Sequence, residues 1–319
     1  MVNPYLRMIK QFHGNILDGA HSQLIPLSRE DFIELYRSLG ATVTGDESTP
    51  KAVRVNPLVT DESTLIETLI SQGVELEKIP FLDHGYRVVS SPFSLGASIE
   101  YLLGHYFLQE TASQLPVQIL SPSMEDTVLD MTAAPGGKTT QMAAYMDNKG
   151  SITAVDVNRR RLYALENNLE RMGVRNAVVY NMDALDLPDE PLFTKVLLDA
   201  PCSGNYVTDG HWFDKRKKSH IQHNFMVQRK LLTKAVSLLE KGGTLLYATC
   251  SLEPEENELN VQWLLENHEV RLDDIDAPGS SGVTEIFGDQ LDDSIKKCRR
   301  LWPNDAGTQG FFLARAVKL

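Results

Sequence analysis

The second half of the chain alternates short apolar runs with amphipathic segments. The clearest apolar runs cover 127–131, 151–157, 177–183, 195–200 and 243–250. Runs of this kind are typical of parallel strands buried on both faces, and the segments between them carry apolar residues at helical spacing. The alternation predicts a doubly wound α/β fold with a mostly parallel sheet, whose ligands bind at the carboxyl ends of the strands.

The N-terminal part of the chain has a different pattern. Ser28 can cap a helix whose apolar residues recur at helical spacing as far as Gly40. Strand patterns over 52–56 and 86–90 flank a second helical pattern over 61–72. Two helices alternating with two strands predict a small α+β unit.

These patterns divide the chain into three parts. We expect an N-terminal α+β domain over residues 1–95, a helical connector packed on the core over 96–126, and the doubly wound domain over 127–319. Gly104 separates the two helical segments expected in the connector, and 310–319 is expected to form the last strand.

The composition is that of an ordinary globular protein, with 42% hydrophobic and 23% charged residues. No run of about 18 apolar residues is present, and residues 1–14 lack the apolar stretch of a signal peptide. We therefore expect a cytoplasmic monomer that does not contact membranes. The three cysteines are Cys202, Cys250 and Cys298, and without a Cys-x-x-Cys pair they predict neither a disulfide framework nor a zinc site.

The first strand of the predicted core runs into a glycine-rich turn, Met-Thr-Ala-Ala-Pro-Gly-Gly-Lys-Thr-Thr over 131–140. Two glycines at the start of a helix let a ligand approach the backbone, and the helix N-terminus favours a negatively charged group. A phosphate-binding P-loop requires glycine where Thr132 stands, and the dinucleotide fingerprint Gly-x-Gly-x-x-Gly is absent. The turn therefore favours a third kind of site, one for S-adenosylmethionine.

Two further aspartates support a site for S-adenosylmethionine. Asp156 ends the second strand 20 residues after Gly136, where a βαβ unit places an acid that binds ribose hydroxyls. Asp183 follows the third strand and is placed for the adenine. A single aspartate after a strand is usually a helix cap, but Asp130, Asp156 and Asp183 stand at three successive strand ends.

Two of the three cysteines follow neighbouring strands of the predicted sheet. Cys202 lies three residues after Asp199, and Cys250 ends the next strand, so both are expected to face the crevice of the methyl donor. Carbon 5 of a pyrimidine is too weak a nucleophile to attack a methyl sulfonium unless a thiolate first adds to carbon 6. An acid such as Asp199 would then support the ring through nitrogen 3. The residues alone leave open which cysteine is the nucleophile.

Several motifs together resemble the Sun-domain family of RNA cytosine-5 methyltransferases. In chain order they are Arg54-Val-Asn56, Gly104-His-Tyr-Phe-Leu-Gln-Glu-Thr-Ala-Ser113, Asp130-Met-Thr-Ala-Ala-Pro-Gly-Gly-Lys-Thr139, Asp199-Ala-Pro-Cys-Ser-Gly204, Tyr247-Ala-Thr-Cys-Ser251, Glu256-Asn-Glu258 and Gly310-Phe-Phe312. The resemblance spans nearly the whole chain. It implies a Rossmann-like class I methyltransferase core preceded by a small RNA-recognition-like domain.

The resemblance also implies a role for each site residue. Cys250 of the Thr-Cys motif is the expected nucleophile, and Cys202 of the Pro-Cys motif assists release of the methylated product. Asp199 and Lys138 are expected to act at the base. The residues expected to hold S-adenosylmethionine are Thr132, Ala133, Ala134, Pro135, Gly136, Gly137, Lys138, Asp156, Asp183 and Asp199.

The charge distribution bears on where RNA would bind. A net charge of −12 excludes an evenly basic RNA-coating protein. The segment 208–234, however, has seven basic residues against two acidic ones, which predicts a phosphate-binding patch at the mouth of the crevice. The seven are Lys215, Arg216, Lys217, Lys218, Arg229, Lys230 and Lys234. A second basic cluster comprises Lys296, Lys297, Arg299 and Arg300.

Two other groups are expected to play no part in the site. The acidic stretch 253–276 is expected to face solvent, away from RNA. His220 and His223 stand three residues apart without a third ligand nearby, so we expect no metal.

The sequence therefore predicts an S-adenosylmethionine-dependent RNA cytosine-5 methyltransferase that acts on tRNA, with rRNA as the alternative substrate. A non-catalytic RNA-binding or ribosome-assembly factor that keeps the fold is an alternative of another class, although such a factor has no need of two thiols beside Asp199. A P-loop nucleotidase, which would bind ATP with magnesium, is a third.

Overall fold

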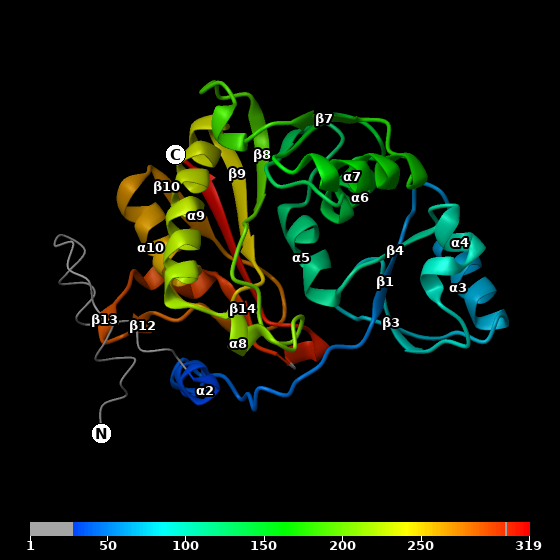
Figure 1. The fold of residues 1–319 in the computed structure, drawn as a ribbon. Coiled ribbons are helices and arrows are strands. Elements are labelled where there is room, and N and C mark those ends of the chain that lie inside the picture. The colour runs from blue at the N-terminus through cyan, green and yellow to red at the C-terminus, as the bar shows by residue number, and fades with distance from the viewer. Residues whose placement is uncertain (1–27, 304) are drawn as a thin grey trace.

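The computed structural model describes residues 28–303 and 305–319. These residues form two units that lie side by side (Figure 1). The larger unit is built on a nine-stranded, mostly parallel sheet, and the smaller one on a four-stranded antiparallel sheet. The predicted fold class, an α/β core with a small N-terminal α+β unit, is confirmed. Residues 1–27, where no signal peptide is expected, lie outside the described residues.

The large sheet contains both parallel and antiparallel strands. The parallel strands are β5 (Thr127–Asp130), β6 (Ser151–Asp156), β7 (Ala177–Asn181), β8 (Phe193–Asp199) and β9 (Leu239–Thr249). The antiparallel strands are β10 (Val270–Asp273), β11 (Ser280–Ser281), β14 (Arg299–Leu301) and β15 (Phe311–Lys318). A separate two-stranded ribbon consists of β12 (Glu285–Ile286) and β13 (Asp289–Gln290).

Helices connect these strands. The α-helices are α5 (Thr111–Leu120), α6 (Gly137–Tyr145), α7 (Arg159–Arg171), α8 (Trp212–Lys215), α9 (Lys218–Leu238) and α10 (Glu258–Asn267). The short 3₁₀ helices are η2 (Ala184–Asp186), η3 (Asp293–Lys297) and η4 (Asp305–Gly307). Within the described ranges, no helix has both the length and the apolar character needed to span a bilayer.

The strand order creates a crevice at one edge of the large sheet. The parallel strands are ordered β9-β8-β5-β6-β7, so the chain runs outward from β5 to β7 and then returns to the other side of β5. Neighbouring strands in this set are all parallel. The carboxyl ends of β5 and β8 therefore flank the point where the order reverses, which is where α/β sheets bind ligands.

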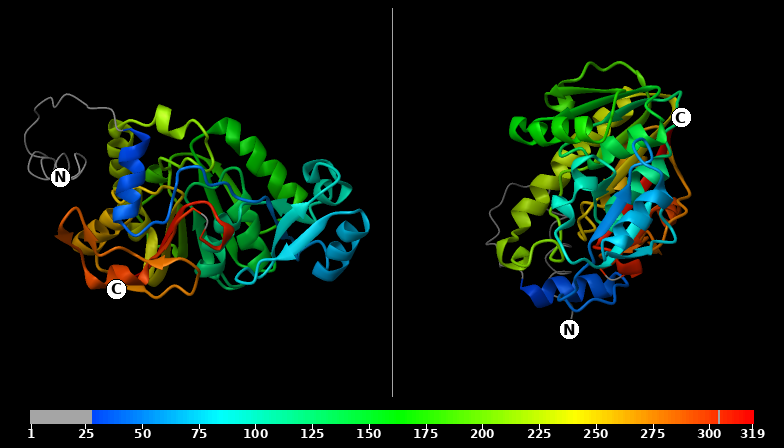
Figure 2. Two further views of the ribbon diagram at one scale, coloured as in Figure 1. Left: turned by 90° about the horizontal axis from the view of Figure 1, so that it is seen from below. Right: turned by 90° about the vertical axis from the view of Figure 1, so that its right-hand side faces the viewer.

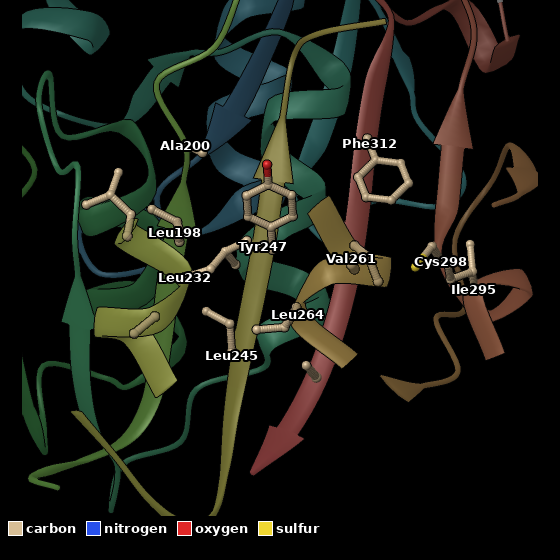
Figure 3. Close-up of a cluster of buried hydrophobic side chains, with 14 of the residues drawn as sticks. Leu198, Ala200, Leu232, Leu245, Tyr247, Val261, Leu264, Ile295, Cys298 and Phe312 are labelled. Carbon is tan, nitrogen blue, oxygen red and sulfur yellow. The ribbon is translucent and has the colours of Figure 1, made fainter. Parts of the chain in front are cut away.

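Helices cover both faces of the large sheet. One face packs against α9 and α10, and Figure 3 shows Leu245 and Tyr247 of β9 beside Leu232 of α9 and Leu264 of α10. The other face packs against α5 and α6. Cys298 lies in the first cluster and is fully buried, and burial raises the pKa of its thiol well above its usual range. It acts as a small apolar side chain, as expected.

The small unit contains the predicted helix and strands together with elements that were not predicted. Its elements are β1 (Ala52–Val55), α3 (Glu62–Ser71), β2 (Glu75–Lys78), β3 (Gly85–Ser90), η1 (Leu95–Ala97), α4 (Ile99–Leu102) and β4 (Tyr106–Leu108). Strand β4 falls where the sequence predicts only a helical connector. The helix α4 stops before Gly104, whose φ is +77°, and Tyr106 then pairs with Val55 of β1. Residues 96–126 are therefore helical only in part.

The first described helix, α2 (Arg29–Ser38), packs on the large unit, although it was expected in the small one. Ser28 caps it as predicted, by accepting a hydrogen bond from the Asp31 amide. The Phe32 ring meets the Trp212 ring edge-on at 5.0 Å between centroids. Figures 1 and 2 show α2 close to α8 and far from α3 and α4. The apolar face of α2 therefore completes the core beside α8 and α9.

Three acidic residues of the stretch 253–276 lie in the interior, so the prediction that this stretch faces solvent is wrong for them. Glu253, Glu256 and Glu258 are each fully buried. Glu258 forms a bidentate ion pair with Arg300, whose Nε lies 2.8 Å from Glu258 Oε1. Because this pair is buried, Arg300 belongs to the core and not to an exposed basic cluster.

Replacing Arg300 with methionine is expected to destabilise the protein by about 3–5 kcal/mol, because Glu258 would keep its buried charge without a partner. The double variant Arg300→Met/Glu258→Met is expected to recover most of that loss, since an apolar pair can replace a buried ion pair at little net change. Urea denaturation of both variants measures the difference. A loss below about 1 kcal/mol for Arg300→Met alone would show that Glu258 is not left as an unpaired buried charge.

Candidate active site

The glycine-rich turn joins β5 to α6 at the reversal point of the sheet. Gly136 has φ +103°, a left-handed conformation that favours glycine, and a Cβ at this position would lie 2.9 Å from Leu165 Cδ1. Thr132 Oγ1 donates a hydrogen bond to the Asp199 carbonyl oxygen at 2.8 Å, which ties the turn to the end of β8. The N-terminus of α6 therefore opens directly onto the crevice.

A pocket of about 230 Å³ lies between this turn and the small unit. Seven residues predicted to bind the methyl donor line it, namely Thr132, Ala133, Ala134, Pro135, Gly137, Lys138 and Asp199. Gly136 is not in the lining, and the Cβ position above shows that it faces α7. The other side is closed by Phe107 of β4 and by Gln109 and Glu110, which lie between β4 and α5. The sequence reasoning did not assign these three to the pocket, although all three belong to the motif 104–113 quoted for the resemblance.

Asp156 stands at the end of β6 and is almost fully buried. Its carboxylate accepts hydrogen bonds from the Ala134 amide at 3.2 Å and the Asn158 amide at 2.8 Å. Its position therefore fixes the shape of the glycine-rich turn. The next residue, Val157, is 64% exposed and presents an apolar surface at the same edge.

Asp183 follows β7 and is half-buried. Its side chain caps η2 by accepting a hydrogen bond from the Leu185 amide at 3.0 Å. It lies at the expected strand end, outside the lining of the pocket beside the turn. The structure therefore shows a capping contact for Asp183 and brings it to the same sheet edge as Asp156.

Lys138 and Asp199 form an ion pair in the crevice, with 2.6 Å between Nζ and Oδ2. Beneath them lies Asp130, which is buried and accepts a hydrogen bond from Thr139 Oγ1 at 2.7 Å. Burial raises the pKa of Asp130 to about 6. The exposed end of the crevice thus carries one cation and one carboxylate side by side.

The two cysteines of the predicted site meet at the ends of β8 and β9. The Sγ atoms of Cys202 and Cys250 are 3.2 Å apart, and both residues are half-buried. The hydrogen bond to Cys250 and burial raise the pKa of Cys202 well above its usual range. Cys202 therefore holds its proton and is placed to donate it in a hydrogen bond to Cys250 sulfur.

Arg54 links the small unit to the glycine-rich turn. Its guanidinium is almost fully buried and donates hydrogen bonds to the Gly137 carbonyl oxygen at 2.6 Å and to Thr140 Oγ1 at 2.8 Å. Burial lowers the pKa of Arg54 to about 9, so the group stays charged at neutral pH. The Arg-x-Asn motif was noticed in the sequence, but nothing local in it indicates a contact with α6.

Most basic side chains of the segment 208–234 are engaged within the protein. Lys215 and Lys234 pair with aspartates at 2.8 Å and 2.6 Å. The guanidinium groups of Arg216 and Arg229 lie over tryptophan rings at 5.1 Å and 5.3 Å. The predicted patch is therefore smaller than the sequence suggests, because these four cations already have partners.

The exposed basic residues of this segment include Lys217 and Lys230.

No group of three or more His, Cys, Asp or Glu side chains that could hold a metal ion is found in residues 28–303 and 305–319.

Glu253 makes the stability of the folded protein depend on pH. Burial raises the pKa of Glu253 to about 8, while the ordinary value of 4.5 applies to the unfolded chain. The charged groups around it are Glu255, Glu256 and Arg300, and Tyr36 donates a hydrogen bond to its Oε1 at 2.6 Å. The folded state binds the Glu253 proton more tightly than the unfolded state does. The contribution of this proton to the free energy of unfolding is therefore full below pH 4.5 and is lost as the pH rises through 8.

The variant Glu253→Gln is therefore expected to lose less stability than the wild type between pH 5 and pH 8.5, by on the order of a few kcal/mol. Thermal unfolding of both proteins across this range measures the effect. Parallel curves for the two proteins would show that Glu253 does not carry the pH dependence.

Comparison with known proteins connects this arrangement to a family. Residues 117–317 match the family described as 16S rRNA methyltransferase RsmB/F. The tRNA (cytosine(49)-C(5))-methyltransferase of Pyrococcus abyssi is 37% identical over 273 residues, which cover 84% of this chain and 88% of that protein. The 25S rRNA (cytosine-C(5))-methyltransferase nop2 of Schizosaccharomyces pombe is 38% identical over 85% of this chain.

The lengths of these relatives differ. The chain spans 46% of the Schizosaccharomyces pombe protein and 38% of the human 28S rRNA (cytosine(4447)-C(5))-methyltransferase, to which it is 36% identical. The solved methyltransferase homologue from Pyrococcus horikoshii superimposes with a TM-score of 0.82, at 36% identity over 90% of this chain and 94% of that one. NSun6 from the same organism, solved with SFG, superimposes with a TM-score of 0.77. Its identity to this chain is 26%, and the match covers 91% of this chain and 94% of that one.

Proposed function

Because the chain belongs to the RsmB/F family, we propose that it transfers the methyl group of S-adenosylmethionine to carbon 5 of cytosine in RNA. The observation that carries this proposal is the pair of thiols, 3.2 Å apart, beside the Lys138–Asp199 ion pair. A dehydrogenase, a nucleotidase or a binding module requires no such pair. Methylation of a pyrimidine at carbon 5 requires a thiolate, and release of the product requires that the thiolate leave again.

The proposed reaction begins at Cys250. Its thiolate sulfur forms a bond to carbon 6 of cytosine, and the electron pair of the ring double bond moves to carbon 5. Carbon 5 then bonds the methyl carbon while the bond from that carbon to the donor's sulfonium breaks and leaves its electron pair on the donor sulfur. A base then removes the proton on carbon 5. The electron pair of that C–H bond restores the ring double bond as the bond from sulfur to carbon 6 breaks. Cys202 donates a hydrogen bond to the departing thiolate.

The base is proposed to lie over the ion pair. A carboxyl group that hydrogen-bonds ring nitrogen 3 stabilises the charge that develops when sulfur adds to carbon 6. Asp199 can do this from the end of β8 when its carboxyl group carries a proton that it shares with nitrogen 3, and Lys138 Nζ, 2.6 Å from Asp199 Oδ2, holds that carboxyl group in place. The ion pair thereby fixes the carboxylate before the base arrives, which avoids reorganisation during the reaction.

The residues of the turn fit the methyl donor. When bound, S-adenosylmethionine supplies an electrophilic methyl carbon on a sulfonium. The pocket beside the turn and the N-terminus of α6 suit its carboxylate end, since helix N-termini favour negative groups. Asp156 and Asp183 lie at neighbouring strand ends and would face its ribose and adenine. A related structure was solved with SFG, an analogue of S-adenosylmethionine.

We propose tRNA as the substrate, with rRNA as the alternative. The match to the Pyrococcus abyssi tRNA enzyme supports tRNA, because it covers 88% of that enzyme's own length. The identities of 36–38% are similar for both groups and do not discriminate between them.

The test is to incubate the protein with labelled S-adenosylmethionine and either total tRNA or ribosomal RNA, and to map 5-methylcytosine by bisulfite sequencing. We expect label at a defined cytosine in tRNA. Label in rRNA alone would overturn the tRNA assignment. If neither RNA is labelled and calorimetry detects no binding of the donor, the methyltransferase proposal fails, and a non-catalytic RNA-binding factor becomes the better explanation.

A further inference from the structure

Cys202 is held from both sides by a buried pair of side chains, Glu256 and Gln228. Gln228 Nε2 donates a hydrogen bond to the carbonyl oxygen of Pro201 at 2.9 Å. The amide of Ser203 donates to Glu256 Oε2 at 3.0 Å. Gln228 Nε2 also donates to the same Glu256 oxygen at 2.8 Å. One hydrogen-bonded pair of side chains therefore holds the backbone on both sides of Cys202.

The pair is anchored to the strand that carries the second thiol. The side chains of Glu256 and Gln228 are fully buried. Asn260 Nδ2 of α10 donates to Gln228 Oε1 at 2.7 Å, and Tyr247 of β9 donates its hydroxyl to the Glu256 carbonyl oxygen at 2.5 Å. Strand β9 ends one residue before Cys250. The positions of both thiols are therefore set by one hydrogen-bonded network.

The Glu256–Gln228 pair is called the brace below. It matters because Cys202 stands on a segment without regular secondary structure. The residues between β8 and α8 have no strand or helix of their own to fix them. A hydrogen bond from Cys202 to Cys250 needs a separation close to the observed 3.2 Å. Displacement of a reacting group by about 1 Å is enough to slow a step by about 10²-fold.

On these grounds we propose that Glu256 and Gln228 are positioning residues, which hold Cys202 at hydrogen-bonding distance from Cys250 for release of the methylated base. The inference rests on the proposed function, since it assigns the brace to one step of that reaction. The negative charge of Glu256 also contributes to the raised pKa of Cys202, which keeps the proton on the sulfur that must donate it. Neither residue lines the pocket beside the glycine-rich turn.

The first test measures the distance between the thiols without RNA or donor. Phenylarsine oxide binds two thiols at once, so its affinity reports whether Cys202 and Cys250 are close. We expect Glu256→Leu and Gln228→Leu, which remove the hydrogen bonds to the Cys202 loop, to weaken its binding at least about 10-fold. The matched control is Glu253→Leu, which removes an equally buried acid from the same segment, where its hydrogen-bond partner is Tyr36 and not the Cys202 loop. The control is expected to bind the reagent like the wild type.

The second test follows the reaction. Glu256→Leu and Gln228→Leu are expected to accumulate a covalent protein–RNA adduct that withstands denaturing electrophoresis, and to form it at a near-normal rate. The Glu253→Leu control is expected to release its product. If both brace variants bind phenylarsine oxide and release product like this control, the positioning role is wrong. If the reagent distinguishes the variants but the wild type methylates no RNA, the proposed function fails while the brace stands.

Discussion

A protein carrying Cys250→Ala is expected to bind RNA and the methyl donor but to lose methyl transfer by at least about 10³-fold. Without the thiolate, carbon 5 has too little electron density to attack a sulfonium. Cys202 does not replace it, because burial and the charge of Glu256 still raise the pKa of Cys202 when the hydrogen bond to Cys250 is gone. Single-turnover measurements with labelled donor and excess protein give the rate, and calorimetry gives the affinity for the donor.

Cys298→Ala provides the matched control for this variant. Cys298 is fully buried in the apolar core and belongs to no strand end of the crevice, so methyl transfer should continue at the wild-type rate in folded protein. Transfer by Cys250→Ala within 10-fold of this control would show that another group is the nucleophile.

Replacement of Cys202 by alanine is expected to leave the first methyl transfer intact and to stop turnover after it. The departing sulfur of Cys250 would lack the hydrogen bond that now reaches it over 3.2 Å, so the bond to carbon 6 would persist. A protein–RNA adduct that survives denaturing gels should accumulate to about one per protein chain, and steady-state turnover should fall by about 10²–10³-fold.

The double variant Cys202→Ala/Cys250→Ala tests which sulfur is attached. It should form no adduct, because the attacking atom is absent. An adduct in the double variant, or free release of product by Cys202→Ala, would contradict the assignment of the two cysteines.

The parallel core could be predicted because its signal is local. Strands such as β5 and β8 are buried on both faces, so each reads as a continuous apolar run with a helical pattern after it. Strand β4 could not be predicted in this way. It has three residues, and its partner β1 lies about fifty positions earlier, so only the tertiary pairing makes it a strand.

The residues of the crevice were predictable for a related reason. Parallel strands bring their carboxyl ends to one edge, so motifs after β5, β8 and β9 meet without any knowledge of side-chain contacts. The buried acids illustrate the limit. Glu256 and Glu258 read as part of a charged, solvated stretch, because their partners Ser203 and Arg300 are 53 and 42 positions away. Charge counting likewise missed that Lys234 is paired.

The buried guanidinium of Arg54 makes the two units poorly separable. It bridges the small sheet to the Gly137 carbonyl oxygen, and Asn56 of the same motif donates to the Met172 carbonyl oxygen at 2.9 Å. Cutting the chain between the units would leave these buried polar groups without partners, which is costly wherever water cannot replace them. The large unit is thus not a separable domain. Its glycine-rich turn is held by a residue of the small unit, so the two units should melt in one cooperative transition.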